Sequence, residues 1–243
     1  MMSKAALVVG ASQGIGLEFA RQLLDRVDRV YATYRSPDCD LFQLDSPSLE
    51  RLQLDLTDEA QIERTIAKIK SETSELHYII NCVGVLHDGA MQPEKSLRHL
   101  NGDQLLKYFQ INSIGAVLLA KHVQPLLKHR DRSVLATISA KVGSIGDNQL
   151  GGWYGYRASK AALNMFMRTT AIEYKRTCPN AIVVNLHPGT TDTRLSKPFQ
   201  KSVPPEKLFS VDRTVRQLLD VIDQLENHQG GEFFSWDGTQ IPW

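Results

Sequence analysis

The 243-residue sequence predicts an α/β protein with one doubly wound parallel sheet and helices on both of its faces. Two observations predict this class. Short apolar runs alternate along the chain with longer segments of helical character, an order typical of βαβ units in a parallel sheet. The first apolar run also leads directly into a glycine-rich turn that opens a helix. Right-handed crossover connections then place helices on both faces of the sheet.

The individual elements follow from this alternation. Five consecutive apolar residues form the first run, which indicates a strand buried on both faces. In chain order, strands are expected at Ala5–Val9, Arg29–Thr33, Leu52–Leu54, His77–Ile80, Ser133–Ile138, Ala181–Leu186 and Glu232–Phe234. Helices are expected at about 12–26, 57–71, 103–127, 156–176 and 212–225. The segment Thr57-Asp58-Glu59 is a typical helix start.

Two stretches interrupt the alternation. Residues 86–102 and 194–210 are irregular and contain four of the chain's ten prolines. Long irregular segments of a compact domain are often lids or binding loops, although plain surface insertions are an equal alternative. We expect a substrate lid at about 194–210. Because no linker, composition shift or repeat divides the chain, we expect a single domain over residues 1–243.

Composition excludes several classes of function. A formal net charge of +1 provides no long-range field for nucleic acid or for an anionic membrane. The three cysteines (Cys39, Cys82 and Cys178) form neither a CxxC pair nor a cluster with zinc spacing, so neither a metal site nor a disulfide framework is expected. No apolar run reaches the ~18 residues of a membrane span. These features predict a cytoplasmic protein.

A glycine turn follows the first strand and indicates a dinucleotide site. Glycine allows a sharp turn and a close approach to a pyrophosphate, while the N-terminus of the next helix supplies N–H donors. The spacing is G-x-x-x-G-x-G rather than the commoner G-x-G-x-x-G. Placed between a strand and a helix, this turn predicts the Rossmann fold. The expected cofactor contacts are Gly10, Ser12, Gln13, Gly14, Ile15 and Gly16.

The end of the second strand bears on the choice of cofactor. NAD-dependent relatives of this fold carry a carboxylate there to bind the ribose hydroxyls. This strand instead ends Ala32-Thr33-Tyr34-Arg35. A guanidinium pairs well with a 2′-phosphate, so Arg35 favours NADP(H), with NAD as the second choice. The alternative for Arg35 is an ordinary solvated side chain.

Further motifs, in the same order and context, resemble the short-chain dehydrogenase/reductase family over essentially the whole chain. They are the turn Gly10–Gly16, Asp55-Leu56, Asn81-Cys82-Val83-Gly84, Asn112, Tyr156-Arg157-Ala158-Ser159-Lys160 and Pro188-Gly189. The segments 151–156 and 236–239 look like the branch that contains sniffer-type carbonyl reductases and bacterial C-factor proteins.

This resemblance implies further cofactor contacts. Asp55 would contact the adenine ring with Leu56 beside it, and Asn81 would lie near the adenosine ribose, followed by Val83 and Gly84. Asp55 capping a helix and Asn81 pinning a strand end are the structural alternatives. Toward the other end of the cofactor, the resemblance implies contacts from Pro188, Gly189, Thr191 and Thr193.

The reaction implied is hydride transfer between a nicotinamide and a carbonyl or alcohol. Carbonyl reduction also needs a proton donor beside the oxygen. Tyr156 and Lys160 are four residues apart and would share one helix face. A nearby ammonium is expected to stabilise the phenolate of Tyr156 and so to lower its pKa. In the family the lysine also binds the nicotinamide ribose, and Asn112 matches the asparagine that holds a proton-relay water.

One position departs from the family. The usual sequence after the fifth strand is Ile-Ser-Ser, whose second serine hydrogen-bonds the substrate oxygen, but this chain has Ile138-Ser139-Ala140. Neighbouring residues of a strand point to opposite faces, unless a bulge changes their direction. We therefore expect either that Ser139 or Ser144 substitutes for the serine, or that Tyr156 polarises the carbonyl alone.

The leading prediction is thus an NADP(H)-dependent oxidoreductase acting on a small carbonyl or alcohol. The alternative is a dinucleotide-binding sensor, or a signalling protein like C-factor, with little turnover. Candidates for the substrate wall are His87, Trp153 and Phe199, each of which could equally be ordinary packing. By family resemblance, the helices at 103–127 and 156–176 are expected to form a homodimer or homotetramer.

Overall fold

The computed structural model describes residues 4–243 and confirms the predicted parallel sheet. Its seven strands lie in the order β3-β2-β1-β4-β5-β6-β9, and every neighbouring pair is parallel. The strands are β1 (Ala5–Val9), β2 (Arg29–Tyr34), β3 (Leu49–Gln53), β4 (Tyr78–Asn81), β5 (Ser133–Ile138), β6 (Ala181–His187) and β9 (Phe233–Ser235). The strand order reverses between β1 and β4, and in doubly wound sheets ligands bind beyond the carboxyl ends of the strands at such a point.

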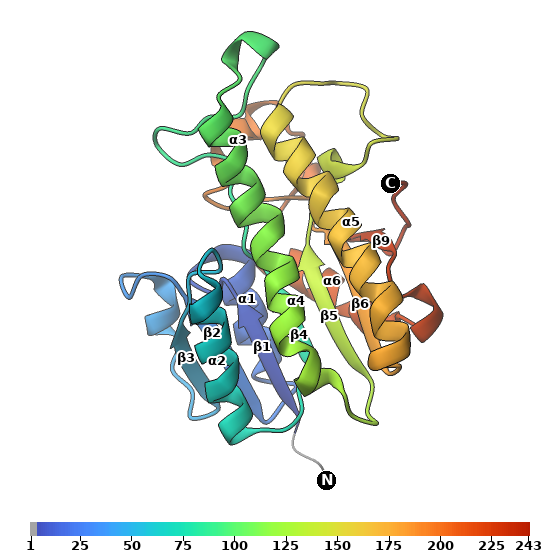
Figure 1. Ribbon diagram of the computed structural model, residues 1–243. Helices are drawn as coiled ribbons and strands as arrows, with labels where there is room; N and C mark the ends of the chain where they lie inside the picture. Colours follow the sequence, from blue (N-terminus) through green and yellow to red (C-terminus); the bar gives the residue numbers. More distant parts are fainter. Residues whose placement is uncertain (1–3) are drawn as a thin grey trace.

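Helices cover both faces of the sheet, as Figure 1 shows. They are α1 (Gly14–Leu23), α2 (Glu59–Glu72), α3 (Gly102–Phe109), α4 (Gly115–Val123), α5 (Tyr154–Thr177) and α6 (Val211–Gln224). Because side chains of a strand alternate between faces, β1 contributes Ala6 and Val8 to the core shared with α1 and α6. Ala5, Leu7 and Val9 enter the opposite core, which is shared with α2, α4 and α5.

The predicted helix at 103–127 is divided. A π-helical turn, η3 (Gln110–Ile114), separates α3 from α4, and a short 3₁₀ turn, η4 (Gln124–Leu127), follows α4. Isolated π-turns inside α-helices occur frequently at functional sites. Asn112 lies in this turn and is 1% exposed.

The two irregular stretches of the sequence contain only short elements. Residues 86–102 include the 3₁₀ turn η2 (Leu97–His99). Residues 194–210 include η6 (Lys197–Ser202), η7 (Pro205–Lys207) and β8 (Leu208–Phe209), which pairs with β7 (Thr190–Thr191). A further 3₁₀ turn, η5 (Lys141–Gly143), follows β5, and η1 (Asp40–Gln43) and η8 (Asn227–Gln229) complete the short elements. No helix of residues 4–243 is long and apolar enough to cross a membrane.

Candidate active site

The glycine turn between β1 and α1 requires its glycines. Gly10 and Gly14 have φ values of +84° and +56°, a left-handed region that L side chains rarely adopt. A Cβ on Gly16 would lie 2.1 Å from the carbonyl oxygen of Gly10, so only glycine allows this contact between helix and turn. Thr33 Oγ1 accepts the Gly10 N–H at 3.0 Å and holds the turn against β2. Sequence reasoning missed Thr33.

The first turn of α1 keeps its N–H donors free of side-chain caps. Its N-cap residue, Gln13, makes no capping bond, and its Oε1 accepts from Arg194 instead. Ser12 is half-buried at the turn, and Ile15 packs against the core below it. Uncapped N–H groups at a helix N-terminus suit a phosphate. The turn therefore suits the phosphates of a dinucleotide, because its glycines place no Cβ in the way.

A pocket of about 440 Å³ lies between the ends of β2 and β3 and the helix α3, and it brings Arg35 and Asp55 together. Arg35 is exposed and makes no ion pair with any residue of 4–243. Asp55 Oδ1 accepts from the backbone N–H and the hydroxyl of Thr57, at 2.9 and 2.7 Å. Asp55 therefore holds the turn before α2 but does not cap that helix, whose N-cap is Asp58, and its carboxylate lines the pocket. Thr57 also lines the pocket and was not anticipated from the sequence.

Of the predicted cofactor contacts that follow β3 and β4, some have structural roles and one borders Lys160. Leu56 is 3% exposed, so its side chain belongs to the core. Asn81 Oδ1 accepts the Val83 N–H at 3.1 Å, which pins the strand end as the structural alternative expected. A Cβ on Gly84 would lie 3.3 Å from Lys160 Nζ, so this segment borders the predicted catalytic lysine.

Tyr156, Lys160 and Asn112 come together at the carboxyl edge of the sheet. Tyr156 and Lys160, from the first turns of α5, are 6% and 3% exposed, and Nζ lies 6.0 Å from the centre of the phenol ring. Nζ donates to the carbonyl of Ile138 at 3.0 Å. Asn112 Nδ2 donates to Ser159 Oγ, whose hydroxyl donates to the Tyr156 carbonyl. The three side chains therefore lie in one buried cluster, although Lys160 is not hydrogen-bonded to the other two.

Burial is the main cause of the pKa shifts of Tyr156 and Lys160. It raises the pKa of Tyr156 above its ordinary value and lowers the pKa of Lys160 to about 8, because a low-dielectric environment disfavours either charged form. We expected the ammonium to lower the pKa of the phenol, but in the protein alone desolvation prevails. Tyr156 is consequently a protonated hydroxyl at neutral pH, and Lys160 is a cation below about pH 8.

The two serines considered as substitutes are both engaged elsewhere. Ser139 Oγ donates to Asn164 Oδ1 at 2.7 Å, and Ser144 Oγ donates to the carbonyl of Pro242 at 2.5 Å. Ala140 packs in the same apolar cluster as Tyr156. No bulge redirects Ser139, since β5 and β6 stay in register up to Ile138. The position that matches the family serine therefore carries only a methyl group.

The segment after β6 closes over the glycine turn. Thr193 lies beside Gly14, where an added Cβ would be 3.4 Å from its methyl group. Thr191 is 3% exposed and its hydroxyl pairs with Thr214 at 2.9 Å, on the side of α6. Gly189 has a φ of +72° and follows Pro188, and an added Cβ there would collide with Phe209 at 2.7 Å.

An aromatic wall stands over Tyr156. The ring of Trp153 lies edge-on, 6.3 Å from the Tyr156 ring and 4.9 Å from that of Phe199, and Phe199 lies 5.8 Å from His87. His87 Nε2 also lies within 3.3 Å of the carbonyl oxygens of Arg194 and Leu195. The three candidate wall residues thus meet, although they come from three separate segments.

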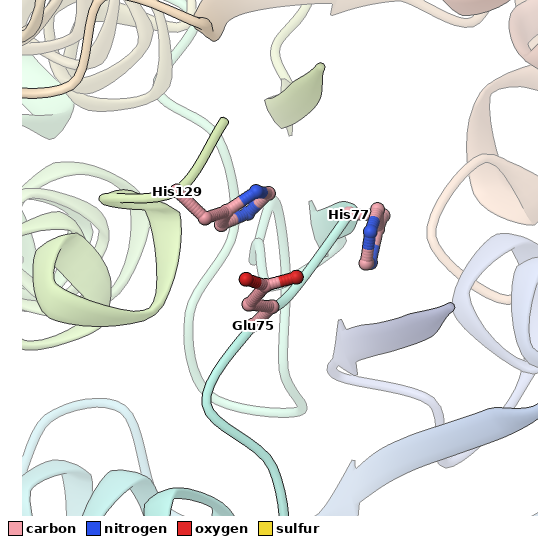
Figure 2. A group of neighbouring side chains, drawn as sticks. All are labelled: Glu75, His77 and His129. Carbon is pink, nitrogen blue, oxygen red and sulfur yellow. The ribbon is translucent and has the colours of Figure 1, made fainter. Parts of the chain in front are cut away.

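A second polar cluster lies at the opposite, amino edge of the sheet and contains Glu75, His77 and His129 (Figure 2). His77 Nδ1 accepts the Ala5 N–H at 3.3 Å, so neutral His77 carries its proton on Nε2. That nitrogen then has no lone pair for a metal. Nε2 of His129 faces the Leu76 carbonyl at 3.0 Å and is therefore the protonated nitrogen of that ring. Burial, followed by the charge of His129, lowers the pKa of His77. His77 therefore has no lone pair directed into the cluster, and we assign no metal site to it.

Comparison with known proteins places these features in a family. Residues 4–204 match the family described as short chain dehydrogenase. The chain is 29% identical to 1-hydroxy-2-glutathionyl-2-methyl-3-butene dehydrogenase of Rhodococcus sp. (strain AD45) over 238 residues, which cover 98% of each protein. It is 34% identical to the C-signal of Myxococcus xanthus over 140 residues, 57% of this chain and 78% of that protein.

Solved structures give the same result. The NADPH-bound carbonyl reductase from chicken fatty liver is 28% identical, superposes with a TM-score of 0.88 and covers 100% of both chains. The matched region includes the glycine turn and the Tyr156–Lys160 cluster. The chain therefore belongs to the short-chain dehydrogenase/reductase family and is an oxidoreductase of that family.

Proposed function

We propose that this protein is an NADP(H)-dependent carbonyl reductase, or the reverse alcohol dehydrogenase, in which Tyr156 is the general acid. The observation that carries the proposal is the buried cluster of Tyr156, Lys160 and Asn112, which borders Gly84 after β4. A protein that only bound a dinucleotide would have no use for a buried phenol and ammonium, since burying an ionisable group is costly.

Arg35 supports the preference for NADP(H). Its guanidinium is exposed at the pocket that also contains Asp55, and no carboxylate within residues 4–243 pairs with it. It is therefore available to pair with a 2′-phosphate in bidentate fashion. The chicken carbonyl reductase with the same fold was solved with NADPH bound, which supports the same choice of cofactor.

The residues divide the chemistry between them. A bound nicotinamide supplies the hydride. Because the pKa of Tyr156 is raised by burial, its hydroxyl stays protonated and can donate to the carbonyl oxygen. Lys160 is a cation below about pH 8, and its charge stabilises the phenolate that remains after donation. Asn112 fixes Ser159, and through it the backbone of the turn that carries Tyr156.

The surroundings of Tyr156 indicate an apolar substrate. Ala140, Val142, Trp153, Leu195 and Phe199 pack against the apolar cluster that contains Tyr156. With a methyl group at position 140 and the serines at 139 and 144 bonded elsewhere, Tyr156 polarises the substrate carbonyl without a serine partner. We expect correspondingly modest rates on unactivated ketones, because one oxyanion donor is typically worth about 3 kcal/mol.

A screen of aldehydes, ketones and dicarbonyls that follows NADPH absorbance tests this function, with Tyr156→Phe as the control. The proposal predicts turnover that depends on Tyr156 for at least one apolar carbonyl. If NADPH binds tightly but no substrate is reduced, the sensor alternative is favoured instead. That alternative draws on the methyl group at position 140 and on the likeness to the C-signal.

We also propose that two copies associate through the helical face formed by α3, α4 and α5; in Figure 1, α3 and α4 run end to end and α5 lies alongside them. Leu106 and Ile114 are 70% and 42% exposed on this face, and Met165 and Ile172 of α5 are 65% and 54% exposed. Light scattering of the purified protein should give twice or four times the monomer mass, and charged substitutions at Met165 and Ile172 should lower it.

A further inference from the structure

The catalytic helix α5 begins without a capping side chain of its own. Its N-cap residue is Trp153, which makes no side-chain capping bond. Trp153 also has a φ of +52° and is the one non-glycine residue of 4–243 in the left-handed region. For a bulky residue this conformation is strained and persists only when its surroundings impose it. Something outside the helix must therefore hold its first turn, which contains Tyr156.

Glu94, from the irregular segment 86–102, supplies the missing cap. Its Oε2 accepts the Gly155 N–H at 3.1 Å, and its backbone carbonyl accepts the N–H of Trp153. One residue of a distant loop thus binds two N–H donors at the start of α5, those of residues 153 and 155. The first N–H groups of a helix have no partner within it and carry partial positive charge, which suits a carboxylate.

The burial of this carboxylate indicates that it has a specific role. Glu94 is 2% exposed, and no Lys, Arg or His of residues 4–243 forms an ion pair with it. Its other oxygen accepts from the side-chain amide of Gln104 at 2.9 Å. Burying an anion is costly unless hydrogen bonds compensate, and here the compensation comes from α3 and from the N-terminus of α5.

The same contacts fix the wall of the candidate substrate site. Gly155 approaches α3 so closely that an added Cβ would lie 2.4 Å from the ring of Tyr108. Arg157 holds the preceding loop by donating to the carbonyls of Gly151 and Gly152. With its N–H bound to Glu94, Trp153 is held with its ring over Tyr156.

We propose that Glu94 is a positioning residue: its buried carboxylate caps α5 from outside at Gly155, its backbone carbonyl holds Trp153, and together they set the place of the Tyr156 hydroxyl. The expected effect of Glu94 on kcat rests on the proposed role of Tyr156 as the general acid. The capping itself is a structural statement that can be tested without a substrate.

The test compares Glu94→Ala and Glu94→Gln with a matched control, Lys95→Ala, which removes the exposed neighbouring side chain. Amide hydrogen exchange is measured along α5, together with the Kd of NADPH and, on a carbonyl found by the screen, kcat and KM. In E94A, exchange at residues 154–157 should accelerate while residues 168–176 stay protected, and kcat should fall about ten- to a hundredfold. The Kd of NADPH should not change. E94Q keeps one acceptor for the Gly155 N–H, so its exchange at residues 154–157 and its kcat should change in the same direction but by less. K95A should match the wild type.

Unchanged exchange at residues 154–157 in E94A would overturn the cap. Faster exchange with an unchanged kcat would overturn the positioning role. If E94A does not fold, E94Q decides by the same two criteria. If the wild type reduces no carbonyl at all, the proposed function fails, while the exchange data still decide whether Glu94 caps the helix.

Discussion

Replacing Ala140 by serine should increase the reductase activity. Ala140 has extended backbone angles (φ −148°, ψ 142°) that serine adopts readily, and it is partly exposed within the apolar cluster that contains Tyr156. The substitution adds a single hydroxyl oxygen at the position where the family resemblance places the serine that hydrogen-bonds the substrate oxygen. It therefore adds a second donor to the substrate oxygen without displacing the wall.

The size of the gain can be bounded. Removing one donor from a preorganised oxyanion site costs about a hundred- to a thousandfold in kcat. A donor added to a site that was not built around it gains less, because part of its interaction orders the new side chain. We expect kcat/KM for an apolar ketone to rise about tenfold, which corresponds to ~1.4 kcal/mol of transition-state stabilisation.

The assay is steady-state reduction at saturating NADPH for the wild type, Ala140→Ser and Ser139→Ala. Loss of the Ser139 hydroxyl breaks its bond to Asn164 and should lower the free energy of unfolding by about 1–2 kcal/mol, while kcat/KM stays near the wild-type value. The reasoning is refuted if Ser139→Ala abolishes turnover, or if Ala140→Ser folds normally and gives no gain on any ketone.

Three further results are expected. Arg35→Ala should weaken NADPH binding by about 2 kcal/mol, roughly thirtyfold, and leave NADH binding unchanged in titrations followed by nucleotide fluorescence; equal losses for both nucleotides would contradict the role of Arg35. Ser144→Ala should lower the urea midpoint by breaking the bond to Pro242 but keep kcat; a collapse of kcat at full stability would contradict this. Burial, followed by the charge of Lys141, lowers the pKa of His187 to about 4 from 6.5. The unfolded chain therefore takes up that proton first as the pH falls, and stability is lost between about pH 6.5 and 4, by at most ~3 kcal/mol from this group. Urea unfolding of His187→Gln should show a shallower loss over this range, and an identical loss would contradict the assignment.

Much of the fold could be predicted because its signals are local. The apolar run of β1, the glycine turn and the helix-start signal at Thr57 each act within a few residues, and the structure places β1 where the sequence did. The i,i+4 spacing of Tyr156 and Lys160 similarly implies a shared helix face. β5 also lies where it was predicted, the helix at 103–127 is divided, and the boundaries of the other elements moved by one to three residues, as packing and capping decide where helices and strands end.

The remaining features depend on contacts between distant segments. The direction of the Ser139 side chain depends on the pairing of β5 with β6 and on Asn164 of α5. The π-turn at Asn112 has no signature of its own, because it forms where the side chain bonds the backbone of Val85. Glu94 is an unremarkable acid in a proline-containing loop until folding brings it to α5. The raised pKa of Tyr156 likewise reflects burial that spacing alone cannot reveal.

The central claim is that the Tyr156 hydroxyl gives the proton to the substrate oxygen. Single-turnover reduction by the enzyme preloaded with NADPH measures this step directly, for the wild type and Tyr156→Phe. We predict that the Phe variant binds NADPH with unchanged Kd and transfers hydride at least about a hundredfold more slowly. Hydride transfer at the wild-type rate in that variant would contradict the account.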